Sequence, residues 1–479
     1  MAAAIKDALT SALDRIRDGD ERFIVSVGAT IAAVAGASAF LRWRRKRARA
    51  ARLAGRVKLA LLPSETSPII MMSPATSTVT FFRGSVAAAA EHLEARVAAI
   101  VAANPWLTSI LDEDPQTGKV EAFYEPGKPS RAFFEVVEGV PLRRGGGGKE
   151  GGGATATAYN DMVAALAPVL CTPSGEAVGT GAPLFRVALL PDADAPTERY
   201  ALVVSANHSL LDGHGFYAVH NMLSEGTAVR ALTPERKTGM PARQLEALGG
   251  EQSLMAACPP GFLARFVFGQ LRNALFPQTV AYGFDVSPTW LARQKAAARA
   301  GGEVPWVSTN DCVVSAFLRC LDPDVAMMAI NFRGKLEGCD AAGDGDAGNY
   351  EDLLTYMRGD YESPALLRRS VGTGAPYRRA GAPATAMLSD WEHVRGATYG
   401  AVTNWSTFAK PLSFGAGEAQ ELHLPLFEWN KACPACVCGS LVLFRPAAGR
   451  VAAMVAGTQA LVDAVKASGM AGAALDIAM

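Results

Sequence analysis

The segment Arg199–Tyr217 (RYALVVSANHSLLDGHGFY) constrains the fold more than any other part of the chain. It begins with an apolar run typical of a buried strand, and His208 follows where that run ends. Asp212 and Gly213 come shortly after, and the glycine relaxes the backbone before a helix expected from His214 to about Leu223. The segment therefore predicts a strand, a tight turn and a helix, with a histidine presented at the turn.

This turn has the residue types needed for proton transfer. A histidine has a reference pKa of about 6.5, so near neutral pH it can take the proton of a hydroxyl or an amine. An aspartate in the same compact turn can hold the turn by pairing with a distant cation rather than by relaying protons. A lone histidine is usually a hydrogen-bonded core residue. Because His208, Asp212 and Gly213 occur together at a strand end, we interpret His208 as a general base.

At 479 residues the chain exceeds one ordinary domain and has room for two halves with separate cores. We expect strands at 76–82, 120–124, 132–137, 184–190, 199–205, 279–284 and 326–332, and helices at 85–103, 214–223 and 311–321. Strands and helices alternate without a regular parallel period, which indicates an α/β or α+β fold. We divide the chain into residues 1–52, 53–245 and 246–479.

The segment 1–52 has the pattern of a membrane anchor. No charged residue occurs from Phe23 to Leu41, and seven arginines and lysines follow in Arg42–Arg52. Nineteen residues in a helix span about 28 Å, close to the thickness of a bilayer's hydrocarbon core. We expect a single-pass transmembrane helix with the body facing the cytoplasm, and the endoplasmic reticulum is one candidate membrane. A surface or buried helix is the alternative, because alanine and glycine make the run only moderately hydrophobic.

Charge and cysteine usage exclude some classes of function. Basic and acidic residues balance at 46 each, but the first 52 residues hold 11 basic and 5 acidic groups, so the body is mildly acidic and nucleic acid is not an expected partner. The pair Cys433 and Cys436, with Cys438, lacks a second ligand pair, so we expect buried strand residues and no metal site. The glycine-rich stretch Gly145–Gly153 lacks the Gly-Lys-Ser/Thr ending of a phosphate loop and is interpreted as a linker.

The pattern His208-x-x-x-Asp212-Gly213 after an apolar strand resembles the signature of the chloramphenicol acetyltransferase-like superfamily. That group includes plant BAHD acyltransferases, wax-ester and diacylglycerol synthases, and peptide-synthetase condensation domains. The segments also similar to the family are Asn104–Leu107, Pro183–Val187, Ser308–Asp311, Asn331–Arg333 and Gly348–Tyr350. The resemblance covers roughly residues 57 to 465. It departs at Asn207, where condensation domains and wax synthases carry a second histidine, and at Ser413–Gly417, an eroded form of the BAHD Asp-Phe-Gly-Trp-Gly motif.

The resemblance implies two similar subdomains with a solvent channel between them and His208 midway along it. The family aspartate points away from the substrate and pairs with an arginine, and Arg333 is the candidate for that partner of Asp212. Thr403 and Trp405 resemble the Thr-x-Trp stretch whose hydroxyl and indole N–H face the developing oxyanion in BAHD enzymes. Trp405 is equally well explained as a core aromatic.

The resemblance also implies an acyltransferase that moves an acyl group from acyl-CoA to a hydroxyl or amine, without a bound cofactor. Two alternatives stay open: a condensation-type enzyme that forms amides from carrier-bound acyl groups, and a non-catalytic member that binds a ligand. The expected partners are a small-molecule acyl donor and acceptor, which the proposed anchor suggests are lipophilic. We expect a monomer.

Overall fold

The computed structural model describes most of the chain from residue 46 onward. The described residues are 46–127, 133–140, 156–250, 259–262, 264, 265, 268, 279–336, 342–371, 388–415, 417–427 and 437–475. They belong to a small unit, residues up to 56 with 113–119, and a large unit, residues 57–112 with 120–479. The predicted membrane segment 23–41, the stretch 145–153, Cys433 and Cys436 lie outside the described residues. None of the helices described is long and apolar enough to cross a bilayer.

The small unit contains a helix over residues 46–53, which carries the last residues of the basic cluster. Arg49 forms an ion pair with Glu113. Both side chains are partly exposed, so this pair contributes little to stability.

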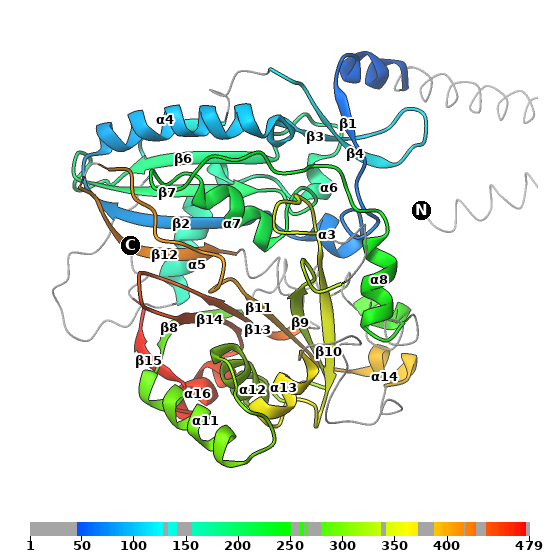
Figure 1. Ribbon diagram of the computed structural model, residues 1–479, viewed down its shortest axis with the longest axis vertical. Helices are drawn as coiled ribbons and strands as arrows, with labels where there is room; N and C mark the ends of the chain where they lie inside the picture. The colour runs from blue at the N-terminus through cyan, green and yellow to red at the C-terminus, as the bar shows by residue number, and fades with distance from the viewer. Residues whose placement is uncertain are drawn as a thin grey trace, which may run out of the picture. The chain divides into compact units, whose positions relative to one another are not determined.

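A five-stranded sheet carries the first half of the large unit. Its strands, in spatial order, are β12 (Ala419–Leu426), β2 (Thr76–Arg83), β7 (Arg199–Ala206), β6 (Phe185–Pro191) and β5 (Phe134–Val136). All neighbours are antiparallel except β5 and β6. The long helix α4 (Val86–Ala103) lies along this sheet (Figure 1), and its apolar residues Leu93, Val97 and Ile100 are fully buried. The β-branched and aromatic composition of β2 suits its central position in the sheet.

Strand β12 comes from the second half of the sequence but completes the sheet of the first half. It pairs with β2, so that His423 lies opposite Thr80 and Leu424 opposite Val79. The boundary drawn at residues 245 and 246 stays a prediction, but a strand from beyond it is built into the first sheet.

A seven-stranded mixed sheet carries the second half. Its strands, in spatial order, are β10 (Glu351–Met357), β9 (Val325–Asn331), β11 (Tyr399–Asn404), β13 (Val437–Phe444), β14 (Ala452–Gly457), β8 (Val280–Val286) and β15 (Ala471–Ala474). Strand β11 runs parallel to both of its neighbours, and the other pairs are antiparallel.

Four helices gather on one side of this sheet (Figure 1): α11 (Pro288–Ala300), α12 (Thr309–Leu321), α13 (Pro364–Ser370) and α16 (Gln459–Ala467). Helix α12 begins at a capping box, in which Ser308 and Asp311 each accept a hydrogen bond from the other's backbone N–H. Asp311 also pairs with Arg368 at 2.5 Å. The residue types at Ser308 and Asp311 are therefore explained by their role in capping the start of a buried helix.

A three-stranded sheet and several short helices complete the fold. The sheet has the order β1 (Val57–Leu59), β4 (Val120–Tyr124) and β3 (Ile110–Glu113). The remaining helices are α3 (Pro68–Met72), η1 (Pro105–Thr108), α5 (Ala156–Leu166), η3 (Ala167–Val169), α6 (Ser174–Ala177), α7 (Gly213–Asn221), α8 (Met240–Ala247) and α14 (Asp390–Arg395).

The strands and helices expected from hydrophobic patterning are confirmed, with their ends shifted by at most two residues. The shifts have local causes. The helix expected at 85–103 uses Ser85 as its N-cap, and the helix expected at 214–223 begins earlier because Asp212 caps it. Patterning did not indicate that β12 joins the first sheet, because strand pairing between distant segments leaves no local signal.

Candidate active site

His208 stands at the end of β7, in a turn that is fixed from both sides. The side-chain oxygen of Asn207 accepts hydrogen bonds from the Ser209 N–H at 3.0 Å and from the Ser174 hydroxyl at 2.7 Å. The Asn207 amide donates to the carbonyl of Thr172 at 3.0 Å. Asn207 therefore occupies the place of the second histidine of related motifs as a buried structural residue, and it sets the turn that presents His208.

Asp212 ends this turn and begins α7. Its Oδ1 accepts a hydrogen bond from the Gly215 N–H at 2.8 Å, which makes it the N-cap of the helix. Its Oδ2 accepts from the Arg333 guanidinium at 2.6 Å and from the Tyr350 N–H at 2.9 Å. The pairing with Arg333 expected from the resemblance is therefore present in the structure, and both carboxylate oxygens accept hydrogen bonds from other groups.

The Asp212–Arg333 pair is buried, with side chains 1% and 0% exposed. Burial opposes ionisation of Asp212, but the Arg333 charge and the N–H groups of Gly215 and Tyr350 together hold its pKa below the ordinary value. Arg333 also donates to the carbonyl of Gly348 at 2.9 Å. The pair thus ties the histidine turn to the segment that precedes β10.

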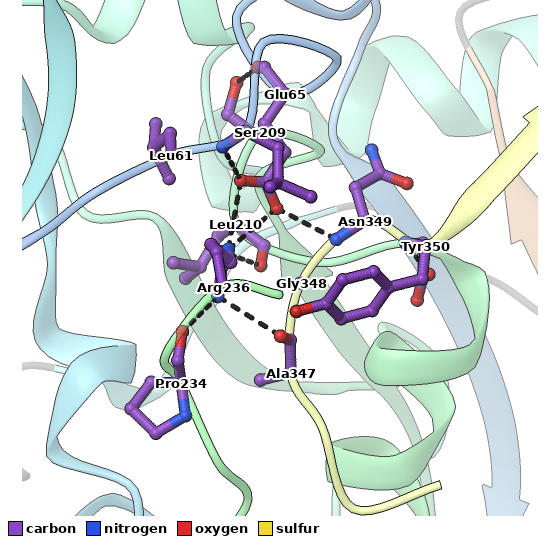
Figure 2. A network of polar contacts seen from close by, with 12 residues as sticks. Leu61, Glu65, Ser209, Leu210, Pro234, Arg236, Ala347, Gly348, Asn349 and Tyr350 are labelled. Atoms are coloured by element: carbon purple, nitrogen blue, oxygen red, sulfur yellow. Dashed lines mark hydrogen bonds and ion pairs between the residues drawn. The ribbon is translucent and has the colours of Figure 1, made fainter. Parts of the chain in front are cut away.

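A second buried ion pair, Glu65 with Arg236, lies in the network shown in Figure 2. Arg236 Nε lies 2.9 Å from Glu65 Oε1, which also accepts the N–H of Asn349 at 2.8 Å. Arg236 donates to the carbonyl of Leu210 at 3.0 Å, and the Ser209 hydroxyl donates to the carbonyl of Glu65 at 2.7 Å. This second pair therefore braces the same turn through its backbone. Nothing in the local sequence around Glu65 or Arg236 indicated it.

Gly348 lies where the two ion pairs meet, and its backbone requires glycine. Its φ is +126°, which side chains rarely adopt, and an added Cβ would lie 3.0 Å from Arg236. The predicted glycine–asparagine loop is thus explained by the close approach of an arginine to its backbone.

The imidazole of His208 is partly open to solvent, with 20% of its side chain exposed. On one side, the Asn349 amide lies 3.3 Å from Nδ1 and 3.3 Å from the His208 carbonyl. On the other side, Nε2 lies 3.6 Å from Oε1 of Glu351. The side chain is therefore partly accessible to solvent, which is a condition that a general base must meet.

The protonation state of His208 suits a base. Burial lowers its pKa, and a hydrogen bond to its own backbone carbonyl together with the charge of Asp212 offsets only part of that lowering. The ring is then neutral at pH 7. When Nδ1 carries the proton that bonds the carbonyl, Nε2 keeps a free lone pair, and when Nδ1 instead accepts from the Asn349 amide, the proton lies on Nε2.

Glu351 is a site residue that sequence reasoning missed. It opens β10, directly after Gly348–Tyr350, and 26% of its side chain is exposed. Burial and the charge of Asp212 raise the pKa of its carboxyl to about 8, against the opposing charge of Arg333. The only signal in the sequence was its place after the glycine–asparagine loop, since its proximity to His208 depends on two distant segments.

The structure brings one of the two expected oxyanion residues to the motif. Trp405 packs against Gly213, where an added Cβ would lie 3.2 Å from the indole Nε1, so the motif glycine leaves room for this ring. Trp405 is 5% exposed and belongs to the core of the first half. Thr403 lies on β11 and is half-buried, and it makes no hydrogen bond with the motif among the described residues. Their oxyanion role stays a prediction.

A small pocket lies beside the turn that holds Asn207. It has a volume of about 130 Å³ and is lined mainly by small and apolar residues, including Ala75, Ser77, Cys171, Thr172 and Leu426. Burial raises the pKa of the Cys171 thiol to about 12, so this cysteine is not a nucleophile. Among the described residues, no cluster of His, Cys, Asp and Glu has the arrangement of a metal site.

No protein-family model and no curated protein matches the sequence. The fold, in contrast, matches solved structures. TRI101 of F. graminearum, complexed with coenzyme A and deoxynivalenol, has a TM-score of 0.53 at 14% identity, over 86% of this chain and 97% of that one. Vinorine synthase has a TM-score of 0.54 at 12% identity, over 88% and 99%. Polyketide synthase associated protein 5 from Mycobacterium tuberculosis has a TM-score of 0.52 at 12% identity, over 87% and 97%.

These matches cover nearly the whole of each solved chain, and identities this low establish the fold and nothing finer. The fold agrees with the expectation raised by His208, Asp212 and Gly213, and with the buried pairing of Asp212 to Arg333. The chain therefore has the chloramphenicol acetyltransferase-like fold that its histidine motif predicts.

Proposed function

We propose that this protein is an acyltransferase that moves an acyl group from acyl-CoA to a hydroxyl or amine, with His208 as the general base. The observation that carries the proposal is a neutral, partly exposed imidazole that is held at a strand end by the Asp212–Arg333 pair. The fold supports it, because similar structures include TRI101 complexed with coenzyme A and deoxynivalenol.

In the proposed reaction, both substrates bind together and no covalent acyl-enzyme forms. His208 Nε2 takes the proton of the acceptor, whose oxygen or nitrogen attacks the thioester carbonyl carbon. The tetrahedral intermediate then expels coenzyme A thiolate, which recovers the proton from His208. Thr403 and Trp405 are the proposed donors to the oxyanion. Asp212 holds the turn and takes no part in proton transfer, because its oxygens are occupied by Arg333 and two N–H groups.

The test is release of free thiol from acetyl-, octanoyl- and palmitoyl-CoA in the presence of a mixed panel of alcohols and amines. We expect His208→Ala to lower turnover by about a hundredfold or more, the usual effect of losing a general base. His214→Ala is the matched control, because it removes the other imidazole of the same turn and should leave turnover near that of the wild type. Both variants should keep the wild-type melting temperature to within a few degrees. Near-normal turnover in His208→Ala would refute the assignment.

We further propose that residues 23–41 anchor a monomeric enzyme to a membrane with its body on the cytoplasmic side, which would suit lipophilic substrates. The support is the length of the uncharged run and the basic residues that follow it. Membrane fractionation of cells that express the full chain, compared with a chain lacking residues 1–52, tests this. Equal recovery of both chains in the supernatant would contradict the anchor.

A further inference from the structure

The side-chain amide of Asn349 lies against His208 at two places. Its Nδ2 is 3.3 Å from Nδ1 of the ring and 3.3 Å from the His208 carbonyl oxygen. When Nδ1 carries the ring proton, the amide donates to the carbonyl, and when Nδ1 is unprotonated, the amide can donate to it. An N–H donor at this place therefore has a partner on His208 in both neutral forms of the ring.

The backbone that carries this amide is held by both buried ion pairs. The three residues of Gly348–Tyr350 bond, in chain order, to Arg333 at 2.9 Å, Glu65 at 2.8 Å and Asp212 at 2.9 Å. Figure 2 shows the bond from the Asn349 N–H to Glu65. The main chain of Asn349 is thus fixed relative to the turn of His208, and its side chain reaches the imidazole from a rigid support.

The other end of the amide has no counterpart to these contacts. Asn349 is 4% exposed, and among the described residues its buried Oδ1 has no hydrogen-bond partner. A buried acceptor without a partner destabilises the folded state. A leucine has the same branched outline as asparagine, keeps the backbone N–H and brings no buried polar oxygen. Stability therefore does not explain an asparagine at this position, whereas the contact of Nδ2 with His208 does.

We infer that Asn349 is a positioning residue for His208, whose amide holds the imidazole in the orientation from which Nε2 meets the acceptor. The inference rests on the proposed acyl transfer and assigns a further residue to it. Asn349 itself touches the Nδ1 edge of the ring, whereas the acceptor meets Nε2 in the proposed reaction.

This arrangement predicts which kinetic constant depends on Asn349. Without the amide, the ring can turn about its side-chain bonds, and a base that is displaced by a fraction of its contact distance takes a proton less readily. The substrates do not touch Asn349, so their binding should not change. Loss of the amide should therefore lower kcat and leave KM for donor and acceptor unchanged.

The experiment compares Asn349→Leu with Asn104→Leu. Asn104 is also a buried asparagine, but its Nδ2 donates to the carbonyl of Arg230 at 3.0 Å and its Oδ1 accepts the Leu232 N–H at 2.8 Å. We expect Asn349→Leu to lower kcat by about tenfold or more, with KM within about twofold and a melting temperature within a few degrees of the wild type. Asn104→Leu should do the opposite, with a lower melting temperature and an unchanged kcat when it is assayed below that temperature.

Two results would overturn the inference. An unchanged kcat in Asn349→Leu shows that the amide does not position the base. A kcat that falls together with the melting temperature, to the extent seen in Asn104→Leu, shows that Asn349 only supports the fold.

A second measurement does not depend on turnover and separates this inference from the proposed function. The ring nitrogens of the wild type and Asn349→Leu are observed by NMR after ¹⁵N labelling of histidine, and the His208 signals are identified by their absence in His208→Ala. We expect the His208 signals to shift in Asn349→Leu and the His214 signals to stay in place. If no acceptor supports thiol release, the proposed function fails and the NMR result decides alone. Shifted His208 signals then support the contact, and unchanged signals overturn it.

Discussion

Two buried ion pairs hold the turn of His208, and they hold their carboxylates differently. Asp212 pairs with Arg333 and also caps a helix, and these contacts lower its pKa although burial opposes its charge. Glu65 pairs with Arg236 between irregular segments, and burial raises its pKa because Arg236 offsets only part of the cost. The first pair therefore fixes a permanent charge, whereas the second contains a carboxyl that can accept a proton. Two equally buried carboxylates can therefore differ in how much stability the protein loses when the partner arginine is removed.

The largest effect is expected when Arg333 is replaced by methionine. Asp212 would stay buried without its cation, which costs about 3–5 kcal/mol of unfolding free energy. Chemical denaturation of Arg333→Met measures this, and thiol release should fall with it because the turn loses its anchor. The double variant Asp212→Asn with Arg333→Met should recover part of the stability. If Arg333→Met is as stable as the wild type, Asp212 does not depend on the charge of Arg333, and the proposed difference between the two pairs is wrong.

Replacing Arg236 by methionine should cost less, about 2–3 kcal/mol, because Glu65 can become protonated and still accept the N–H groups of Leu62 and Asn349. The same denaturation experiment compares the two variants directly. Arg236→Met proving more damaging than Arg333→Met would reverse the comparison.

Gly348→Ala tests the point that connects the pairs. The substitution strains a backbone at φ +126° and forces the new Cβ against Arg236, while the Gly348 carbonyl must still reach Arg333. We expect a loss of about 1–3 kcal/mol. Gly226→Ala is the control, because nothing lies within 4 Å of its added Cβ. If Gly348→Ala and Gly226→Ala are equally stable, Arg236 can move away from the new Cβ without a loss of unfolding free energy, and this position does not require glycine.

The smallest effects should appear in the pH dependence of stability. The pKa of Glu65 is higher in the folded than in the unfolded protein, so the wild type should lose stability relative to Glu65→Gln as pH rises above about 4.5 and through the folded pKa. The pKa of Asp212 is lower in the folded protein, so its contribution is present above about pH 4 and is lost as pH falls through the folded value. Each unit of difference corresponds to about 1.4 kcal/mol. Parallel pH profiles for wild type, Glu65→Gln and Asp212→Asn would contradict the assigned directions.

The turn of His208 and its partner Arg333 could be predicted from the sequence, because the turn is a local pattern and the arginine belongs to a segment that resembles the family. A strand, His208, Asp212 and Gly213 follow one another within a short segment, and the Asn331–Arg333 strand end could be matched by resemblance. Glu65, Arg236 and Glu351 could not be found this way. Each takes its meaning from a contact with a residue far along the chain, and an isolated glutamate is ordinarily a solvated surface residue.

The expected oxyanion residues illustrate the same limit at a finer scale. The sequence placed Thr403 and Trp405 near the active histidine by resemblance alone. The structure places Trp405 against Gly213, where packing is sufficient to explain it, and gives no comparable contact for Thr403. Whether either donates to an oxyanion depends on where a substrate carbonyl sits, and residue patterns do not encode that position.

The placement of β12 has a consequence for how the chain is made. Thr80 and His423 are 343 positions apart yet share a hydrogen bond of 2.7 Å. During synthesis, this edge of β2 therefore stays unpaired until β12 has been made and most of the chain has left the ribosome. An exposed edge of this kind invites pairing with other chains. Separate expression of the first half should accordingly yield aggregates, and supplying the β12 peptide in trans should restore solubility.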